Sequence, residues 1–149
     1  MLELAVANYL LNNAGVAALV GARGYVQVLP QSADYPAFRV QLIDEVERGH
    51  LRGGATLRPA RVQVDAVGEE ADGMDTYGEV LALANAINAA LMNQPPIVTT
   101  VTDGASPAVM TTLELKVVAR EANPPIYDPQ ELSQFKIGQD FLIWARVLP

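Results

Sequence analysis

The chain has 149 residues, which suits one domain, and it carries a net charge of −7. Such an acidic chain lacks the clustered basic residues that grip nucleic acid over a broad surface or adhere to an anionic membrane. It contains no cysteine, which excludes disulfides and thiolate chemistry. It also lacks an 18-residue apolar run that could span a membrane. Its apolar N-terminal segment lacks the basic residues of a signal peptide, so we expect a protein that stays in a cytoplasm.

The hydrophobic fraction is high and the charged fraction is low. Half of the residues are hydrophobic and 18% are charged, against about 25% in a typical soluble domain. Alanine-rich helices account for part of this difference. Contacts between subunits would account for the rest, because the cores of protein interfaces are depleted in charge.

The N-terminal half predicts two helical segments followed by three strands. Apolar residues at helical spacing define the first helix, and they are Leu2, Val6, Tyr9 and Leu10. Gly15 is expected to interrupt this helix, and a short helical turn over 16–20 ends at Gly21. The strands are predicted over 25–29, 37–46 and 61–67.

The middle of the chain predicts a long loop and one well-defined helix. The segment around 47–59 contains two adjacent glycines and no apolar periodicity, so we expect a mobile loop that joins two strands of a hairpin. The helix is predicted over 74–93. Its apolar stripe consists of Tyr77, Val80, Leu81, Ala84, Ile87 and Leu91.

The C-terminal third predicts a strand over 97–102 and then a long hairpin. Residues alternate between apolar and polar from Leu113 and again from Phe135. Leu142 and Trp144 fall on the half-charged face of the last strand, where a monomer normally places polar groups. Either a helix of the same chain or a neighbouring subunit is expected to cover them. The predicted fold class is α+β: one domain over 1–149, with a mainly antiparallel sheet, an N-terminal helix and a longer central helix packed on it.

No residue pattern predicts catalysis, a cofactor or a metal. The single histidine, His50, has no nucleophile motif beside it, and the acidic run from Glu69 to Glu79 lacks the spacing of a calcium loop. This run is explained as the acidic start of a helix. The other unusual cluster is basic and lies in and just after the predicted loop, at Arg48, Arg52, Arg58 and Arg61. It is either a solvated hairpin tip or a surface that docks on an acidic neighbour or faces passing DNA.

Several segments, taken in order, resemble the tail terminator, or tail completion, proteins of long-tailed bacteriophages and related gene transfer agents. The first is "VAALVGARGYVQVLPQSADYPAFRV" at 16–40, where a short helix, a Gly-Arg turn, a strand and a Tyr-Pro-initiated strand follow one another. The second is "RVQVDAV" at 61–67, followed by the helix that ends in "AINAALMN". The third is "IYDPQELSQFKIGQDFLIWARV" at 126–147. Residues 97–110 are more strand-like than the family's pattern, which leaves the strand order at that edge open.

The resemblance implies structural work in a virion. Such proteins form rings, typically homo-hexamers, that cap the head-proximal end of the finished tail tube, stop its polymerisation and provide the head–tail joining surface. The implied partners are other copies of the chain, the tail tube protein and a head-completion or neck protein, with DNA only passing through the bore. For the ring contacts, the sequence offers Arg48, Arg52, Arg58, Leu142 and Trp144. The alternatives are a small-molecule or peptide-binding α+β module without catalysis and, more remotely, an enzyme of unfamiliar type.

Overall fold

The structure is a computed structural model, and it describes residues 1–45, 58–69, 74–92, 94–102, 110–123, 126–127 and 134–148. Most of the predicted loop over 47–59, including Arg48 and Arg52, therefore lies outside the described residues. No helix among the described residues is long and apolar enough to span a bilayer.

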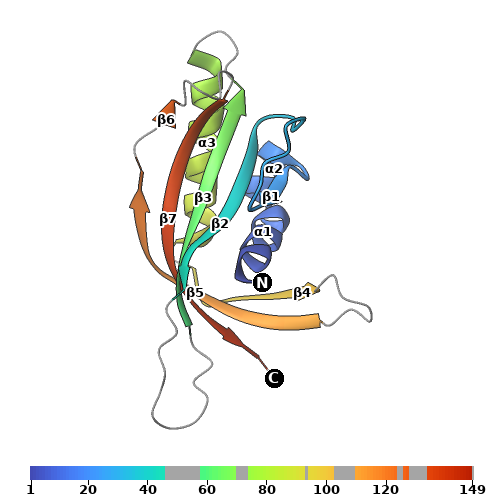
Figure 1. Ribbon diagram of the computed structural model, residues 1–149, viewed down its shortest axis with the longest axis vertical. Helices are drawn as coiled ribbons and strands as arrows, with labels where there is room; N and C mark the ends of the chain where they lie inside the picture. The colour runs from blue at the N-terminus through green and yellow to red at the C-terminus, as the bar shows by residue number, and fades with distance from the viewer. Residues whose placement is uncertain are drawn as a thin grey trace.

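Three helices and seven strands make up the described part of the chain (Figure 1). In chain order they are α1 (Leu2–Asn12), α2 (Ala14–Val20), β1 (Gly24–Val26), β2 (Ala37–Glu45), β3 (Arg58–Glu69), α3 (Met74–Leu91), β4 (Ile97–Thr102), β5 (Met110–Ala122), β6 (Ile126–Tyr127) and β7 (Gln134–Val147). The predicted α+β class, with a mainly antiparallel sheet, is confirmed.

All seven strands belong to one sheet in the order β1-β2-β3-β7-β5-β4, and β6 pairs with β7 in line with β5. Only β1 and β2 are parallel. The two predicted hairpins are confirmed, because β2 pairs with β3 and β5 pairs with β7, both antiparallel. The strand order left open by the sequence is now clear: β4 lies at the edge of the sheet, beside β5.

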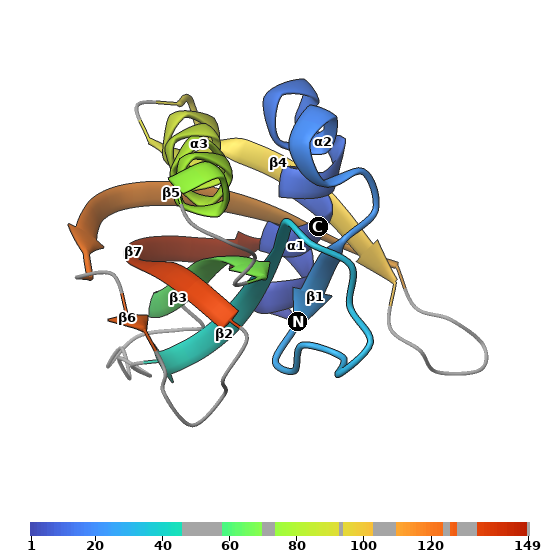
Figure 2. The same ribbon diagram turned by 90° about the horizontal axis from the view of Figure 1, so that it is seen from above.

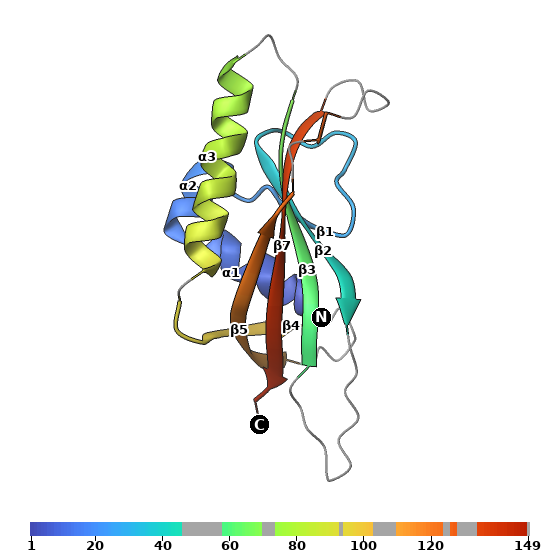
Figure 3. The same cartoon turned by 90° about the vertical axis from the view of Figure 1, so that its left-hand side faces the viewer.

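The helices pack on one side of a strongly curled sheet (Figure 3). Helix α3 contacts β3 and β7, whereas α1 contacts β1 and β2 as well as β4 near the other end of the sheet. The curl places α1 between the two ends of the sheet (Figure 2). This arrangement buries a core whose largest members include Phe38, Phe141, Leu83 and Ile87. Each such side chain contributes roughly 1.5–3 kcal/mol to folding through the apolar area it removes from water.

Helix α3 approaches β3 closely because Gly68 has no side chain. A Cβ at this position would lie 2.5 Å from a methyl carbon of Val80 and 2.9 Å from a methyl carbon of Thr76. The buried Gln139 of β7 faces the same helix, and its Nε2 donates to the carbonyl oxygen of Ala84 at 2.7 Å. This bond gives the amide nitrogen a partner inside an otherwise apolar layer.

Two details of the predicted helices are wrong. The buried stripe of α3 contains Leu83 where we expected Leu81, and Leu81 and Tyr77 are 37% and 46% exposed. The ring of Tyr77 instead packs edge-on against Phe135. The break between the first two helices lies at Asn13 rather than Gly15, because the Asn13 side chain accepts hydrogen bonds from the first amides of α2.

Two β-bulges also change the predicted faces. One lies between Leu42 and Asp44, and the other lies between Val117 and Ala119. The second bulge moves Ala119 opposite Leu142, so Ala119 leaves the face of Leu115 on which the strict alternation had placed it.

Candidate functional site

The face of the sheet opposite the helices is the candidate functional site, and we call it the open face. Register and hydrogen bonds assign to it Arg39 and Gln41 of β2, Arg61, Gln63 and Asp65 of β3, Asp140, Leu142 and Trp144 of β7, and Glu114, Lys116 and Val118 of β5. No helix of the described chain covers this face (Figure 3). The expectation that a helix of the same chain covers Leu142 and Trp144 is therefore not met by the described residues.

Two carboxylates are buried in the centre of the open face. Asp65 is 1% exposed and Asp140 is 6% exposed, although both lie on the face without helices. We call Asp65, Asp140 and the four side chains that bind them, Arg39, Arg61, Gln63 and Asn123, the carboxylate cluster. Burying a carboxylate is costly unless it is paired and hydrogen-bonded, so these contacts determine whether the face is stable.

Among the described residues, each carboxylate has one charged and one amide partner. The Arg39 Nη2 donates to Asp65 Oδ2 at 2.6 Å, and the Gln63 Nε2 donates to Asp65 Oδ1 at 2.9 Å. At Asp140, the Asn123 Nδ2 donates to Oδ1 at 2.9 Å. Both carboxylate oxygens of each aspartate are therefore engaged, which suits a structural role.

Arg61 binds Asp140 through two nitrogens. Its Nε donates to Asp140 Oδ2 at 2.8 Å, and its Nη2 donates to the same oxygen. This hydrogen bond and the negative charge of Asp140 raise the pKa of Arg61 above its ordinary value. The guanidinium is half exposed, so the pair sits at the boundary between the sheet and solvent.

Gly138 gives the carboxylate cluster its space. This residue lies opposite Asp65 in the register of β3 and β7. A Cβ at Gly138 would lie 2.9 Å from Asp65 Oδ1, 3.0 Å from Gln63 Nε2 and 3.4 Å from Asn123 Nδ2. A side chain here would displace groups that are already held by hydrogen bonds.

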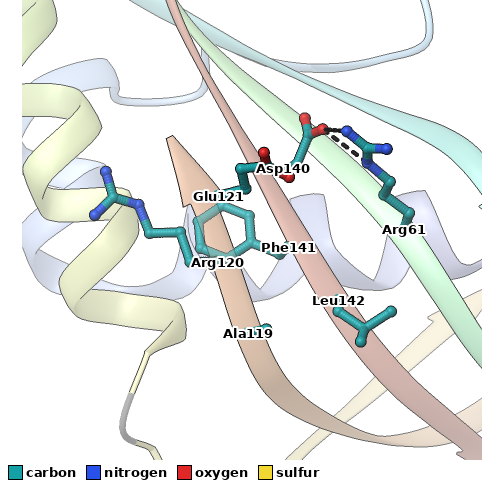
Figure 4. A pocket seen from close by; sticks show the side chains of 7 residues that line it. All are labelled: Arg61, Ala119, Arg120, Glu121, Asp140, Phe141 and Leu142. Carbon is teal, nitrogen blue, oxygen red and sulfur yellow. Dashed lines mark hydrogen bonds and ion pairs between the residues drawn. The ribbon is translucent and has the colours of Figure 1, made fainter. Parts of the chain in front are cut away.

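A depression of about 430 Å³ lies beside the carboxylate cluster, between β3, β7 and β5. Figure 4 shows Arg61 paired with Asp140 on one side and Arg120 extending away from them on the other. Leu142 lines the depression and is 39% exposed.

A second depression of about 430 Å³ surrounds Trp144. Its other lining residues are Glu114, Lys116, Val118 and Arg146. Trp144 is half-buried and lies opposite Lys116, while Arg146 Nη2 pairs with Glu114 Oε2 at 2.9 Å. Val118 is 43% exposed because it is the bulged residue of β5. A tryptophan with aliphatic and charged neighbours has the chemistry of a protein interface, where Trp and Arg are enriched.

The structure brings together two of the five predicted contact residues. Leu142 and Trp144 are two positions apart on the open face, and they line adjoining depressions. Arg58 is the first residue of β3, three residues before the predicted start of that strand, and it lies opposite Ala145. The described residues contain no group of three or more His, Cys, Asp or Glu side chains that could hold a metal.

The sequence reasoning missed the carboxylate cluster. The available signal was the period-two pattern of the predicted hairpin, which places Arg39 and Asp65 on the outward face of neighbouring strands. Opposite charges at facing positions indicate an ion pair. The burial of that pair required the structure.

Comparison with known proteins assigns the chain to a family. The profile of the family described as "Tail completion protein gp17" matches residues 5–107, which is more than two thirds of the chain. The chain belongs to this family. The resemblance found in the sequence is thereby confirmed, and the tail completion protein is a structural protein of the bacteriophage tail.

A solved structure has the same fold. One chain of a structure described as "Virion of native gene transfer agent (GTA) particle" aligns over 98% of the tail completion protein and 93% of its own length. The TM-score is 0.52 and the sequence identity is 22%, so the match supports the fold. No curated protein matched the sequence.

Proposed function

We propose that this tail completion protein forms a homo-hexameric ring on the head-proximal end of the tail tube. The ring stops tube polymerisation and provides the surface to which the DNA-filled head joins. Its membership in the tail completion family is the observation that carries this proposal. Its partners are other copies of the chain, the tail tube protein and a head-completion or neck protein, and DNA only passes through the bore.

The ring requires two different contact patches on each subunit, because a closed ring is built from heterologous contacts. The open face supplies one patch, in which Leu142 and Trp144 lie beside the half-exposed Arg61 and Arg146. The low charged fraction of the chain suits stacking on other protein rings. We further propose that Arg48, Arg52 and Arg58 contribute to a subunit or joint contact and that the ring acts without catalysis, cofactor or metal. It assembles in the host cytoplasm and remains in the virion.

Purified protein tests the capping role directly. Tail tube protein that polymerises in vitro should stop elongating when the tail completion protein is added, and electron micrographs should show a ring on one end of each tube. The ring blocks growth because one of its faces accepts a tube subunit and the other does not. The proposal would be contradicted if tubes elongated at the same rate with and without the protein. It would also be contradicted if the protein bound to the tubes as single subunits and formed no ring.

The Trp144→Ala variant tests the open face as a subunit contact. We expect the ring to be lost while the monomer stays folded, because Trp144 is a half-buried aromatic residue at the centre of the second depression. Truncating an interface hot spot costs about 2 kcal/mol or more of binding, roughly a thirtyfold loss of affinity. Sedimentation measures assembly, and circular dichroism measures folding.

A matched control is Val28→Ala, which shortens a side chain that is 72% exposed on the segment between β1 and β2. This variant should assemble like the wild type. A Trp144→Ala protein that is folded and fully assembled would remove the open face from the interface.

A further inference from the structure

We infer that the outer edge of β4 is a pairing site for an extended segment of a second copy of this chain, so that the sheet continues from one subunit into the next. The inference rests on the proposed ring and adds the element that joins its subunits. Strand β4 is one of the two ends of the sheet and lies at the same end of the molecule as the C-terminus (Figure 1).

The backbone of β4 presents unpaired groups outward at alternate residues. The amide of Leu148 donates to the carbonyl of Thr112 at 2.9 Å, so the peptide groups of Thr112 point toward β7 and away from β4. Thr112 lies opposite Thr100 of β4. These two residues therefore form a pair without backbone hydrogen bonds between them, and in such pairs the side chains approach closely. The two hydroxyl oxygens are indeed 3.2 Å apart.

The same alternation fixes the direction of the other peptide groups in β4. Ile97, Thr99 and Val101 bond to β5, whereas Val98, Thr100 and Thr102 direct their N–H and C=O groups to the outer side. Within the described part of the chain, no hydrogen bond reaches that side. The side chains of Val98, Thr100 and Thr102 are also exposed, Val98 at 60%.

The edges of β1 and β5 are protected, and the edge of β4 is not. Strand β1 has three residues, and its outward carbonyl at Val26 already accepts the amide of Val28 at 2.8 Å. The part of β5 that does not pair with β4 contains charged residues and a bulge, and both features hinder pairing with another strand. Strand β4 has the sequence IVTTVT, in which every residue is β-branched and none is charged. Such an edge is a template for another strand.

Charge and position favour a second copy as the occupant. A copy of this chain carries a net charge of −7, and an uncharged edge allows it to approach without local repulsion. Val98, Glu114 and Arg146 lie in one row across β4, β5 and β7, so the edge continues into the depression around Trp144. A neighbour that pairs with β4 would therefore reach both surfaces. The donated segment is not the neighbour's β4, because pairing of two β4 strands gives a two-fold dimer instead of a ring.

Proline at position 100 tests the edge. The N–H of Thr100 points outward, so Thr100→Pro removes a donor from the outer edge and leaves the β4–β5 ladder intact. Thr100→Val is the matched control: it loses the same hydroxyl contact with Thr112 but keeps the N–H. We expect folded monomers of both variants, rings from Thr100→Val, and loss of rings from Thr100→Pro at concentrations at which the wild type assembles.

Hydrogen exchange gives a second measurement that needs no variant. In the wild-type ring, the amides of Val98, Thr100 and Thr102 should exchange at least about tenfold more slowly than in the monomer, whereas those of Thr99 and Val101 should be protected in both. Rings from Thr100→Pro, or equal exchange at the outward amides in ring and monomer, would overturn the inference while leaving the ring in place. If the ring forms without tail tube protein but protection appears only when tail tube protein is added, the second copy is overturned as the occupant. A wild-type protein that forms no ring on tubes would instead refute the proposed function.

Discussion

Deleting the gene for this protein should give a lysate that contains DNA-filled heads and separate tails of irregular, often excessive length. The tails grow too long because nothing occupies the end of the tube when it reaches its finished length. The heads remain separate because the joining surface is missing. Negative-stain electron microscopy measures both effects, as the distribution of tail lengths and the fraction of heads that carry a tail.

Complementation makes this experiment specific. A plasmid copy of the wild-type gene should restore tails of uniform length joined to heads, and the Trp144→Ala copy should not, since its product does not form the ring. Thr100→Val is the control copy that should rescue. Normal tails attached to heads in the deletion lysate would show that the chain is not the terminator, and a ligand-binding role would then be the better hypothesis.

The sequence predicts the fold well where a local pattern determines the structure. The alternation in 37–46 and 61–67 identified β2 and β3 and their pairing, and Gly21, with φ of 58°, ends α2 as expected for a glycine. Helix α3 was predicted from its periodicity, but its buried stripe includes Leu83 instead of Leu81. Both leucines are compatible with a helical stripe, and only the position of the sheet decides which of them it covers.

Bulges are the main reason that the faces could not be fully predicted. Val118 differs in no obvious way from the other apolar residues of β5, yet an extra residue there reverses the faces of everything after it. The bulge brings Ala119 next to Leu142 and leaves Val118 exposed beside Trp144. The composition of the candidate interface thus depends on a register shift that the local sequence does not signal.

The buried carboxylates could not be predicted for a different reason. Asp140 stands among Phe141, Ile143 and other apolar residues, and its alternation correctly places it on the outward face. An outward aspartate is ordinarily solvated. Here the long side chains of Arg39 and Arg61 and the missing side chain at Gly138 allow neighbouring polar groups to close over both carboxylates.

Replacing Arg39 with alanine should destabilise the monomer by about 3 to 5 kcal/mol, because it leaves the carboxylate of Asp65 with Gln63 as its side-chain donor among the described residues. Asp65 is 1% exposed while Arg39 is in place, so the variant removes the charged partner of a carboxylate that the folded sheet otherwise buries. For a domain of this size, such a loss lowers the Tm by roughly 10 °C. Differential scanning calorimetry and urea unfolding measure the change.

Two further variants separate burial from charge. Arg146→Ala removes an arginine whose partner, Glu114, is 26% exposed, and it should cost less than about 1 kcal/mol, as is usual for surface ion pairs. The double variant Arg39→Met with Asp65→Leu removes both charges while roughly keeping their volume, so most of the stability lost in Arg39→Ala should return. If Arg39→Ala and Arg146→Ala had equal costs, the Arg39–Asp65 pair would behave as a surface pair. The pairing of the strands alone would then stabilise the open face. The carboxylate cluster would not be needed to hold Leu142 and Trp144 in position for a neighbouring subunit.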